Sequence, residues 1–249
     1  MHFYKLSRKS EVRSQKSDLG LRTLDFRLIL IFCTLLSFLS CGNGKTPASD
    51  NTAQTPATAE TPTTSNKKTI LFFGDSLTAG YGLDDPQQAF PGVIQHKIDS
   101  LKLPYSVVNA GNSGETTAGG LGRIDWALKQ KVDIFVLELG ANDGLRGVPV
   151  AETRQNLQAI IDKVKGKYPK AKIILTGMQM PPSMGSAYTD AFKAVYPAIA
   201  KKNKIAFVPF LLTGVAGDPK LNQRDGIHPT AEGAKIVAEN VWAVLKGDL

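Results

Sequence analysis

Three residues of the sequence have the types that nucleophilic catalysis requires. Ser76 follows the apolar run Ile70–Phe73 in the stretch Gly-Asp-Ser, and His228 lies in the segment Asp-Gly-Ile-His-Pro. A serine hydroxyl becomes nucleophilic when a histidine accepts its proton, and a carboxylate can fix the tautomer of that histidine. Asp225 precedes His228 across a turn that contains glycine, so its carboxylate can reach the imidazole. The three residues together indicate a serine hydrolase.

Other interpretations of these residues are open. Serine is a preferred cap at helix N-termini, and Asp-Gly is a common turn, so each residue alone has a structural explanation. The two remaining histidines are weaker candidates for a base. His2 lies in a basic segment near the N-terminus, and His96 lies in the middle of an expected helix, where a solvated role is favoured.

A hydrolase of this kind also needs hydrogen-bond donors for the oxyanion that forms on the attacked carbonyl group. The candidates are the backbone N–H of Ser76, a glycine of the segment 109–117 and the side-chain amide of Asn142. Each of them could equally be an ordinary turn residue. A phosphate-binding loop is disfavoured for residues 111–122, because they lack both the Gly-Lys-Ser/Thr ending and the G-x-G-x-x-G spacing.

The elements that must position these residues are predicted by the hydrophobic pattern from residue 67 onward. Continuous apolar runs, typical of strands covered on both faces, alternate with stretches of helical length. The expected strands are Thr69–Phe73, Tyr105–Asn109, Asp133–Leu139, Lys172–Thr176 and Ile205–Val208. The expected helices are Ala89–Leu101, Thr117–Lys129, Val150–Lys167, Tyr188–Lys202 and Thr230–Lys246. The alternation predicts an α/β fold with a parallel sheet between helices, in which ligands bind at the carboxyl ends of the strands.

The first 40 residues are expected to be an export signal. A segment rich in Lys and Arg precedes an uncharged run from Leu28 to Leu39, which is too short to span a membrane as a helix. The run ends at Ser-Cys-Gly, which resembles the cleavage box of bacterial lipoproteins and predicts lipidation of Cys41. Phe38 and Leu39 depart from the usual form of that box. We therefore expect an exported protein that is periplasmic or anchored to a membrane by lipid.

Residues 41–66 are expected to be a disordered tether, because they are rich in Thr, Pro and Ala and contain no aliphatic side chain larger than alanine. Residues 67–249 then form a single hydrolase domain. The net charge of +8 lies partly in the basic leader, and no basic run with interleaved aromatic residues follows it, so no nucleic-acid partner is expected.

The cysteines and the acidic residues suggest no further covalent or metal chemistry. Of the two cysteines, Cys33 lies inside the expected signal, so the exported chain could not form an internal disulfide. No cluster of His, Cys and carboxylates has the spacing of a metal site. We expect a monomer without metal or cofactor.

Four segments of the chain resemble the motifs of the SGNH or GDSL hydrolases, in particular their group of lysophospholipases, thioesterases and arylesterases. The segments are Gly74–Tyr81, Val108–Thr117, Glu138–Gly147 and Asp225–Pro229, in the order found in that family. The resemblance implies a three-layer, flavodoxin-like fold with strand order 2-1-3-4-5. It makes Ser76 the nucleophile, His228 the general base and acid, and Asp225 the carboxylate that orients the histidine. It also makes Gly114 the second oxyanion donor, beside Ser76 and Asn142.

The substrate is expected to be a small-molecule carboxylic ester, a lysolipid or a thioester. The acyl chain is expected to lie along Asp143–Val148 and Met178–Tyr188, where three methionines suggest an adaptable apolar wall, although core packing is an equal alternative. The expected contact residues are Asp143, Gly144, Leu145, Met180 and Pro181. Coenzyme A thioesters are not expected as natural substrates of an exported domain. Two other functions are open: a carbohydrate O-acetylesterase with the same triad, and a lipoprotein that binds ligands without catalysis.

Overall fold

A computed structural model describes residues 67–249 of the chain. The expected export signal (1–40), the expected tether (41–66) and the expected lipidation site Cys41 lie outside the described residues. Within the described part, no helix is both long enough and apolar enough to cross a membrane.

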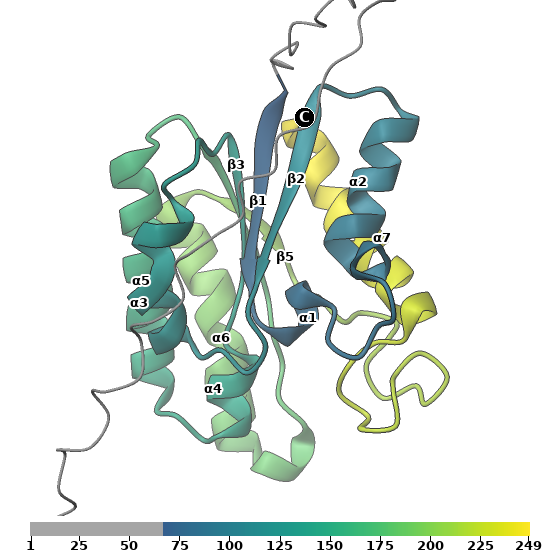
Figure 1. Cartoon of the computed structure of the whole chain (residues 1–249). Helices are drawn as coiled ribbons and strands as arrows, with labels where there is room; N and C mark the ends of the chain where they lie inside the picture. The colour runs from purple at the N-terminus through teal and green to yellow at the C-terminus, as the bar shows by residue number, and fades with distance from the viewer. Residues whose placement is uncertain (1–66) are drawn as a thin grey trace, which may run out of the picture. The chain divides into compact units, whose positions relative to one another are not determined.

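Five strands form one parallel sheet within residues 67–249 (Figure 1). They are β1 (Lys68–Gly74), β2 (Tyr105–Gly111), β3 (Ile134–Glu138), β4 (Lys172–Thr176) and β5 (Ala206–Val208). The order is β2-β1-β3-β4-β5, which confirms the strand order implied by the resemblance. All five strands lie close to their expected positions, with bounds that differ at most at the ends.

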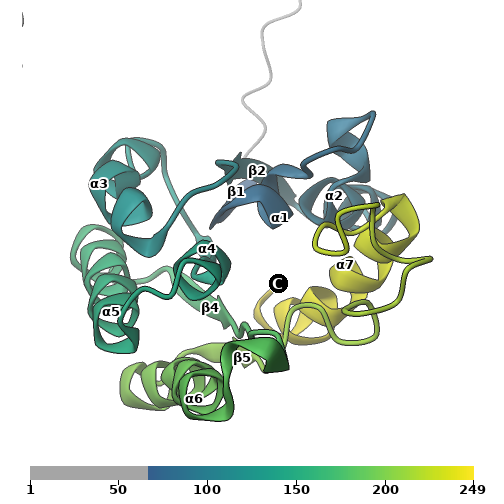
Figure 2. The ribbon, with the colours of Figure 1, turned by 90° about the horizontal axis from the view of Figure 1, so that it is seen from below.

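Two layers of helices cover the sheet, which confirms the predicted α/β/α arrangement. The long helices are α2 (Phe90–Ser100), α3 (Thr117–Ala127), α5 (Val150–Lys167), α6 (Ser186–Asn203) and α7 (Ala231–Leu245). Helices α2 and α7 lie on one face of the sheet, and α3, α5 and α6 lie on the other (Figure 2). The short elements are α1 (Ser76–Ala79), α4 (Ala141–Leu145) and the 3₁₀ turns η1 (Pro86–Gln88), η2 (Pro182–Met184) and η3 (Lys246–Asp248).

The central strands are buried on both faces. Every residue from Ile70 to Phe73 in β1 and from Phe135 to Leu137 in β3 has an exposed fraction of 0%. Side chains of successive residues in a strand point to opposite faces, so both helical layers pack on these strands. Full burial of one such side chain contributes roughly 1.5–3 kcal/mol to stability. The burial on both faces explains why the strands appear as continuous apolar runs in the sequence.

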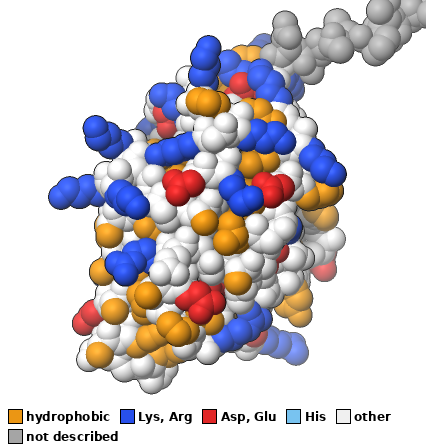
Figure 3. All heavy atoms as spheres, turned by 90° about the vertical axis from the view of Figure 1, so that its left-hand side faces the viewer, with side chains coloured by type: hydrophobic (Ala, Val, Ile, Leu, Met, Phe, Trp, Pro, Cys, Tyr) orange, Lys and Arg blue, Asp and Glu red, His pale blue; other side chains and the backbone are white. Residues whose placement is uncertain are grey.

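The outer face of the layer formed by α3 and α5 carries charges of both signs (Figure 3). One exposed ion pair, between Lys163 Nζ and Asp125 Oδ2 at 2.7 Å, links α5 to α3. Such exposed pairs contribute little to stability. Hydrophobic side chains gather at the lower end of this face in Figure 3, which is the end at which the strands finish.

Two glycines allow α1 to lie directly against the ends of the strands. A Cβ atom on Gly111, the last residue of β2, would overlap with the backbone of Ala79 in α1. A Cβ atom on Gly74, the last residue of β1, would overlap with the Thr78 hydroxyl and would lie 2.6 Å from the carbonyl oxygen of Glu138. The absence of side chains at both positions therefore lets α1 begin immediately after β1, with Ser76 as its first residue.

We expect the substitution Gly111→Ala to lower stability by about 1–3 kcal/mol, because the neighbouring atoms are backbone and cannot rotate away. Urea unfolding monitored by circular dichroism measures the change. Gly122→Ala is the matched control, since Gly122 is exposed in α3 and nothing lies near its Cβ position. The control variant should be as stable as the wild type or more stable by up to about 1 kcal/mol. Equal unfolding midpoints for the two variants would contradict the close approach of α1.

Candidate active site

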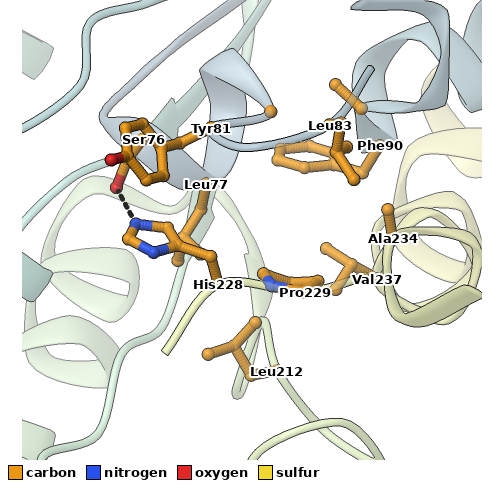
Figure 4. Close-up of a pocket in the computed structure, with 12 residues that line it drawn as sticks. Ser76, Leu77, Tyr81, Leu83, Phe90, Leu212, His228, Pro229, Ala234 and Val237 are labelled. Carbon is orange, nitrogen blue, oxygen red and sulfur yellow. Dashed lines mark hydrogen bonds between the residues drawn. The ribbon is translucent and has the colours of Figure 1, made fainter. Parts of the chain in front are cut away.

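The structure brings Ser76, His228 and Asp225 into one hydrogen-bonded series. His228 Nε2 lies 2.9 Å from Ser76 Oγ (Figure 4). On the other side of the ring, His228 Nδ1 lies 2.6 Å from Asp225 Oδ2. The serine comes from the end of β1, whereas the other two residues come from the loop that precedes α7. This geometry allows the imidazole to accept the serine proton while the carboxylate stabilises the imidazolium that forms.

Asp225 shapes the loop that carries His228. Its Oδ1 accepts hydrogen bonds from the backbone N–H groups of Ile227 (2.9 Å) and His228 (3.0 Å). Gly226, which follows Asp225 in this turn, has a φ of 71°. Burial raises the pKa of Asp225, but the hydrogen bonds from the His228 ring and from the two N–H groups outweigh this effect and lower it to about 2. The carboxylate is therefore ionised at neutral pH.

Ser76 does not cap α1, because the preceding residue does. The Asp75 side chain accepts a hydrogen bond at 3.0 Å from the backbone N–H of Leu77, and this bond satisfies an N–H group of the first turn. The helix ends at Gly80, which has a φ of 79°. The Ser76 hydroxyl is thus available to His228, which disfavours the interpretation of this serine as a helix cap.

Tyr81 and Gln223 hold His228 in place, and the sequence analysis identified neither of them. The Tyr81 ring lies against the imidazole, with ring centroids 4.8 Å apart. The Gln223 amide donates to the carbonyl oxygens of Tyr81 (2.7 Å) and Pro229 (2.9 Å), and the Gln223 backbone N–H donates to the His228 carbonyl oxygen (2.7 Å). Gln223 therefore joins the histidine loop to the segment that follows α1. Its bond to Tyr81 joins segments that lie far apart in the sequence, so no local pattern could have shown that contact.

Gly114 lies in the loop between β2 and α3, as the expected bounds of the strand and the helix predicted. It is exposed, with a φ of 79°, and its carbonyl oxygen accepts hydrogen bonds from the two terminal nitrogens of Arg146 at 3.2 and 3.1 Å. Arg146 is the C-cap residue of α4. These bonds join the Gly114 loop to the segment that carries Asn142.

Arg123 in α3 fixes the same loop from the other side. Its Nε donates to both carboxylate oxygens of Glu115, at 2.6 and 2.8 Å. Its Nη2 donates to the carbonyl oxygens of Ala110 (2.8 Å) and Gly74 (3.2 Å), and the guanidinium lies 4.0 Å from the centre of the Phe73 ring. A single side chain thus binds the ends of β1 and β2 and the loop after β2. The sequence analysis did not single out Arg123 or Glu115.

Asn142 in α4 is oriented by Asp75. The Asn142 side-chain Nδ2 donates to Asp75 Oδ2 at 3.1 Å. An amide nitrogen carries two hydrogens, so the bond to Asp75 uses only one of them. Asn142 is half-buried in α4, just after the end of β3. Strand β3 is the neighbour of β1, the strand that leads to Ser76.

Asp75 also lies beside a second buried acid, Glu138. Both carboxyl groups have an exposed fraction of 0%. Burial raises the pKa of Asp75 to about 6. Burial and the neighbouring Asp75 charge raise the pKa of Glu138 well above its usual range. The sequence analysis did not assign a role to either acid.

The residues expected to contact the acyl chain lie in different environments. The Asp143 carboxylate is buried and accepts hydrogen bonds from the backbone N–H (2.8 Å) and hydroxyl (2.5 Å) of Thr117, so it links α4 to α3. Gly144 and Met180 are buried against each other. Leu145 and Pro181 are exposed.

The expected methionine wall is therefore largely core. Met178 and Met180 have exposed fractions of 4% and 8% and belong to the hydrophobic core, and the half-buried Met184 packs against it. Core packing, the alternative given equal weight, is the better description of the two buried methionines. Composition alone could not distinguish a groove from a core, because methionine is common in both.

One narrow pocket directly adjoins Ser76 and His228. It lies between α1, α2 and α7. Its walls are mostly apolar, with Ser76, Tyr81 and His228 on one side (Figure 4). The other lining residues include Leu77, Leu83, Phe90, Leu212, Pro229, Ala234 and Val237.

Among residues 67–249, no group of three or more His, Cys, Asp or Glu side chains could hold a metal ion.

Comparisons with known proteins agree with this geometry. Residues 72–236 match the GDSL-like Lipase/Acylhydrolase family. The chain is 43% identical to Esterase TesA of Pseudomonas aeruginosa over 180 residues, which cover 72% of this chain and 88% of that protein. It is 39% identical over 172 residues to the thioesterase 1/protease 1/lysophospholipase L1 of Escherichia coli K12, with 69% and 80% of the two chains covered. A crystal structure of TesA superposes with a TM-score of 0.70 at 43% identity and covers 73% of this chain and 100% of that chain.

We expect Arg123→Lys to lower kcat by roughly 10- to 100-fold, because lysine cannot maintain the bonds to Glu115 and to two carbonyl oxygens at once, so the Gly114 loop loses its position. Steady-state ester hydrolysis measures the loss. Arg154→Lys is the matched control, since Arg154 is exposed on α5. If both variants were as active as the wild type, the Arg123 bonds would have no influence on the site.

Proposed function

The chain belongs to the GDSL-like lipase/acylhydrolase family and is a hydrolase of ester bonds, and we propose that it acts through an acyl-enzyme formed on Ser76. The observation that carries this proposal is the series of contacts from Ser76 Oγ to His228 Nε2 (2.9 Å) and from His228 Nδ1 to Asp225 Oδ2 (2.6 Å). Serine and histidine in hydrogen-bond contact, with the histidine oriented by a third group, are the minimum for an activated serine nucleophile.

In the first half of the proposed reaction, His228 Nε2 accepts the Ser76 proton as Oγ attacks the carbonyl carbon of the ester. The negative charge moves to the carbonyl oxygen, where three donors would stabilise it: the N–H groups of Ser76 and Gly114 and the Asn142 amide. Ser76 is the first residue of α1, and N–H groups in the first turn of a helix have no partner within that helix. The protonated His228 then donates its proton to the leaving oxygen, and the C–O bond breaks.

In the second half, water replaces the alcohol. His228 removes a proton from the water, the hydroxide oxygen attacks the acyl carbon, and the same donors stabilise the second oxyanion. The bond to Ser76 Oγ breaks as His228 returns the proton to it. Asp225 stabilises the imidazolium in both halves, because its low pKa keeps it ionised throughout.

We further propose that the substrates have apolar acyl chains of medium or long length, as lysolipids do, and that the leaving group can vary, as it does between aryl esters and thioesters. The related proteins are named as an esterase and as a thioesterase and lysophospholipase, which supports this class. Around the catalytic residues, Tyr81, Leu145 and Ile227 keep exposed fractions of 55%, 44% and 45%. Exposed apolar side chains at the rim of a site are suited to contact with an apolar substrate.

The proposed location of the enzyme is the surface of a membrane. The expected export signal and the expected lipidation site Cys41 lie outside the described residues. The proposal of a membrane location is therefore supported by the sequence around Cys41. A lipid anchor at that position would keep the domain close to lysolipids.

We expect the purified protein to hydrolyse p-nitrophenyl esters from acetate to palmitate, with the highest kcat/KM at medium or long chains. Ser76→Ala should lower kcat at least ~1,000-fold, because no other group replaces the nucleophile. A fluorophosphonate probe should label the wild type and fail to label the variant. Activity confined to acetate would favour a carbohydrate O-acetylesterase, and a folded wild type that is neither active nor labelled would favour a binding protein.

Asp225→Asn should lower kcat by roughly 1,000-fold or more with little change in KM, because an amide neither stabilises the imidazolium nor selects the productive tautomer. Asp218→Asn is the matched control, since Asp218 is also exposed and also accepts a backbone hydrogen bond in its own loop. The measurement is steady-state hydrolysis of one ester by the three proteins. A similar kcat for all three would show that Asp225 does not act on the histidine.

A further inference from the structure

Two buried carboxyl groups, Asp75 and Glu138, lie beside the nucleophile and have no part in the proton transfers described above. Asp75 precedes Ser76, and Glu138 is the last residue of β3, paired with Gly74 in the sheet. Glu138 Oε2 accepts hydrogen bonds from the backbone N–H of Asp75 (3.2 Å) and from the hydroxyl of Thr78 (2.8 Å). The two acids are thus packed together where β1 ends and the chain turns into α1.

The pair must hold a proton. Neither acid forms an ion pair with a cationic side chain of residues 67–249. Two adjacent carboxyl groups that are removed from water and from cations cannot both be ionised at neutral pH, since each charge disfavours the other and burial disfavours both.

The hydrogen bonds indicate which of the two carries the proton. Both Asp75 oxygens act as acceptors, one for Leu77 N–H and one for Asn142 Nδ2. In contrast, Glu138 Oε1 is buried, and no group among the described residues donates a hydrogen bond to it. If Glu138 were ionised, this oxygen would have no hydrogen bond. A proton on this oxygen turns it into a donor, and the adjacent Asp75 carboxylate can accept its hydrogen bond.

We infer that Glu138 is a positioning residue that stays protonated and donates to Asp75, so that Asp75 remains an ionised acceptor for the Asn142 amide. The inference rests on the proposed function, in which Asn142 stabilises the oxyanion. An ionised carboxylate can accept but not donate, so it binds Asn142 through Nδ2 and leaves the second hydrogen of that nitrogen for the substrate. If the proton moved to Asp75, its O–H could bind Asn142 Oδ1, and the amide could turn by 180°.

The surrounding charges agree with this assignment. Burial raises the pKa of Asp75 to about 6, and burial together with the Asp75 charge raises the pKa of Glu138 well above its usual range, so both shifts favour a proton on the pair, and the hydrogen bonds assign it to Glu138. The other titratable groups close to the pair are His228, whose charge favours an ionised Asp75, and Tyr196, whose pKa is raised by burial and by the charges of both acids. Tyr196 donates its hydroxyl to the carbonyl oxygen of Leu139 at 3.1 Å and adds no positive charge.

The test compares two substitutions of the same residue. Glu138→Gln keeps a neutral hydrogen-bond donor in the same shape, so its kcat should stay within about threefold of the wild type. Glu138→Leu removes the donor and should lower kcat roughly 100-fold with little change in KM, because Asn142 loses its orientation. Thr176→Val is the matched control, because it removes another buried hydrogen bond, from Thr176 Oγ1 to the Leu137 carbonyl oxygen, at the end of β4. This control should lower stability without a comparable loss of kcat.

Two further measurements distinguish a positioning role from a merely structural one. Asn142→Ala should cost much less in the Glu138→Leu background than in the wild type, because the amide is already misplaced there. The second measurement does not require the leucine variant to fold. The infrared C=O stretch of a protonated carboxylic acid should be present in the wild type at neutral pH and absent in Glu138→Gln.

A large loss of kcat in Glu138→Gln, an absent carboxylic-acid band, or additive effects of the Glu138→Leu and Asn142→Ala substitutions would each overturn the inference. Failure of the proposed function has a different signature, since the wild type itself would then show no turnover that depends on Ser76. The two failures are therefore separable in the same set of proteins.

Discussion

The parallel register of β1 with both of its neighbours places Gly74 opposite Gly111 in β2 and opposite Glu138 in β3. Three strands therefore end at one level, and the residues that follow them emerge side by side. Because a parallel sheet fixes the direction of each strand, Ser76, the Gly114 loop and the helix with Asn142 cannot be displaced independently. The arrangement of the candidate site is a direct result of strand register, and the loops add only the final orientation.

The buried acids at this site impose a cost in stability that depends on pH. A carboxyl group whose pKa is raised in the folded state binds its proton more tightly there than in the unfolded chain, so stability falls as pH rises above the unfolded pKa. For Asp75, this fall extends from the usual value of 3.8 to about 6, and for Glu138 it continues to higher pH. The buried acids therefore lower the stability of the protein while they orient their hydrogen-bond partners, a combination that is common where function requires buried polar groups.

Sequence patterns predicted the parts of the fold and site that depend on local signals. Runs such as Ile70–Phe73 are long enough to identify strands, and Ser76, Asp225 and His228 indicate a serine hydrolase when they are considered together, although each alone has a structural explanation. Helices α1 and α4 were not predicted, because four or five residues cannot show a helical period. The roles of Arg123, Gln223 and Glu138 depend on contacts with segments distant in the chain, for which a single sequence contains no signal.

The loop with His228 is attached far less firmly than the strand that ends at Ser76. Residues 224–227 are exposed, and the loop is held mainly by a bridge between Asn222 and Pro229, the Gln223 hydrogen bonds and the Tyr81 ring. Segments with few buried apolar contacts open at a much lower free energy than a sheet does. On warming, the histidine loop should therefore detach while the sheet is intact, so that thermal inactivation of this enzyme is a reversible local transition that precedes denaturation.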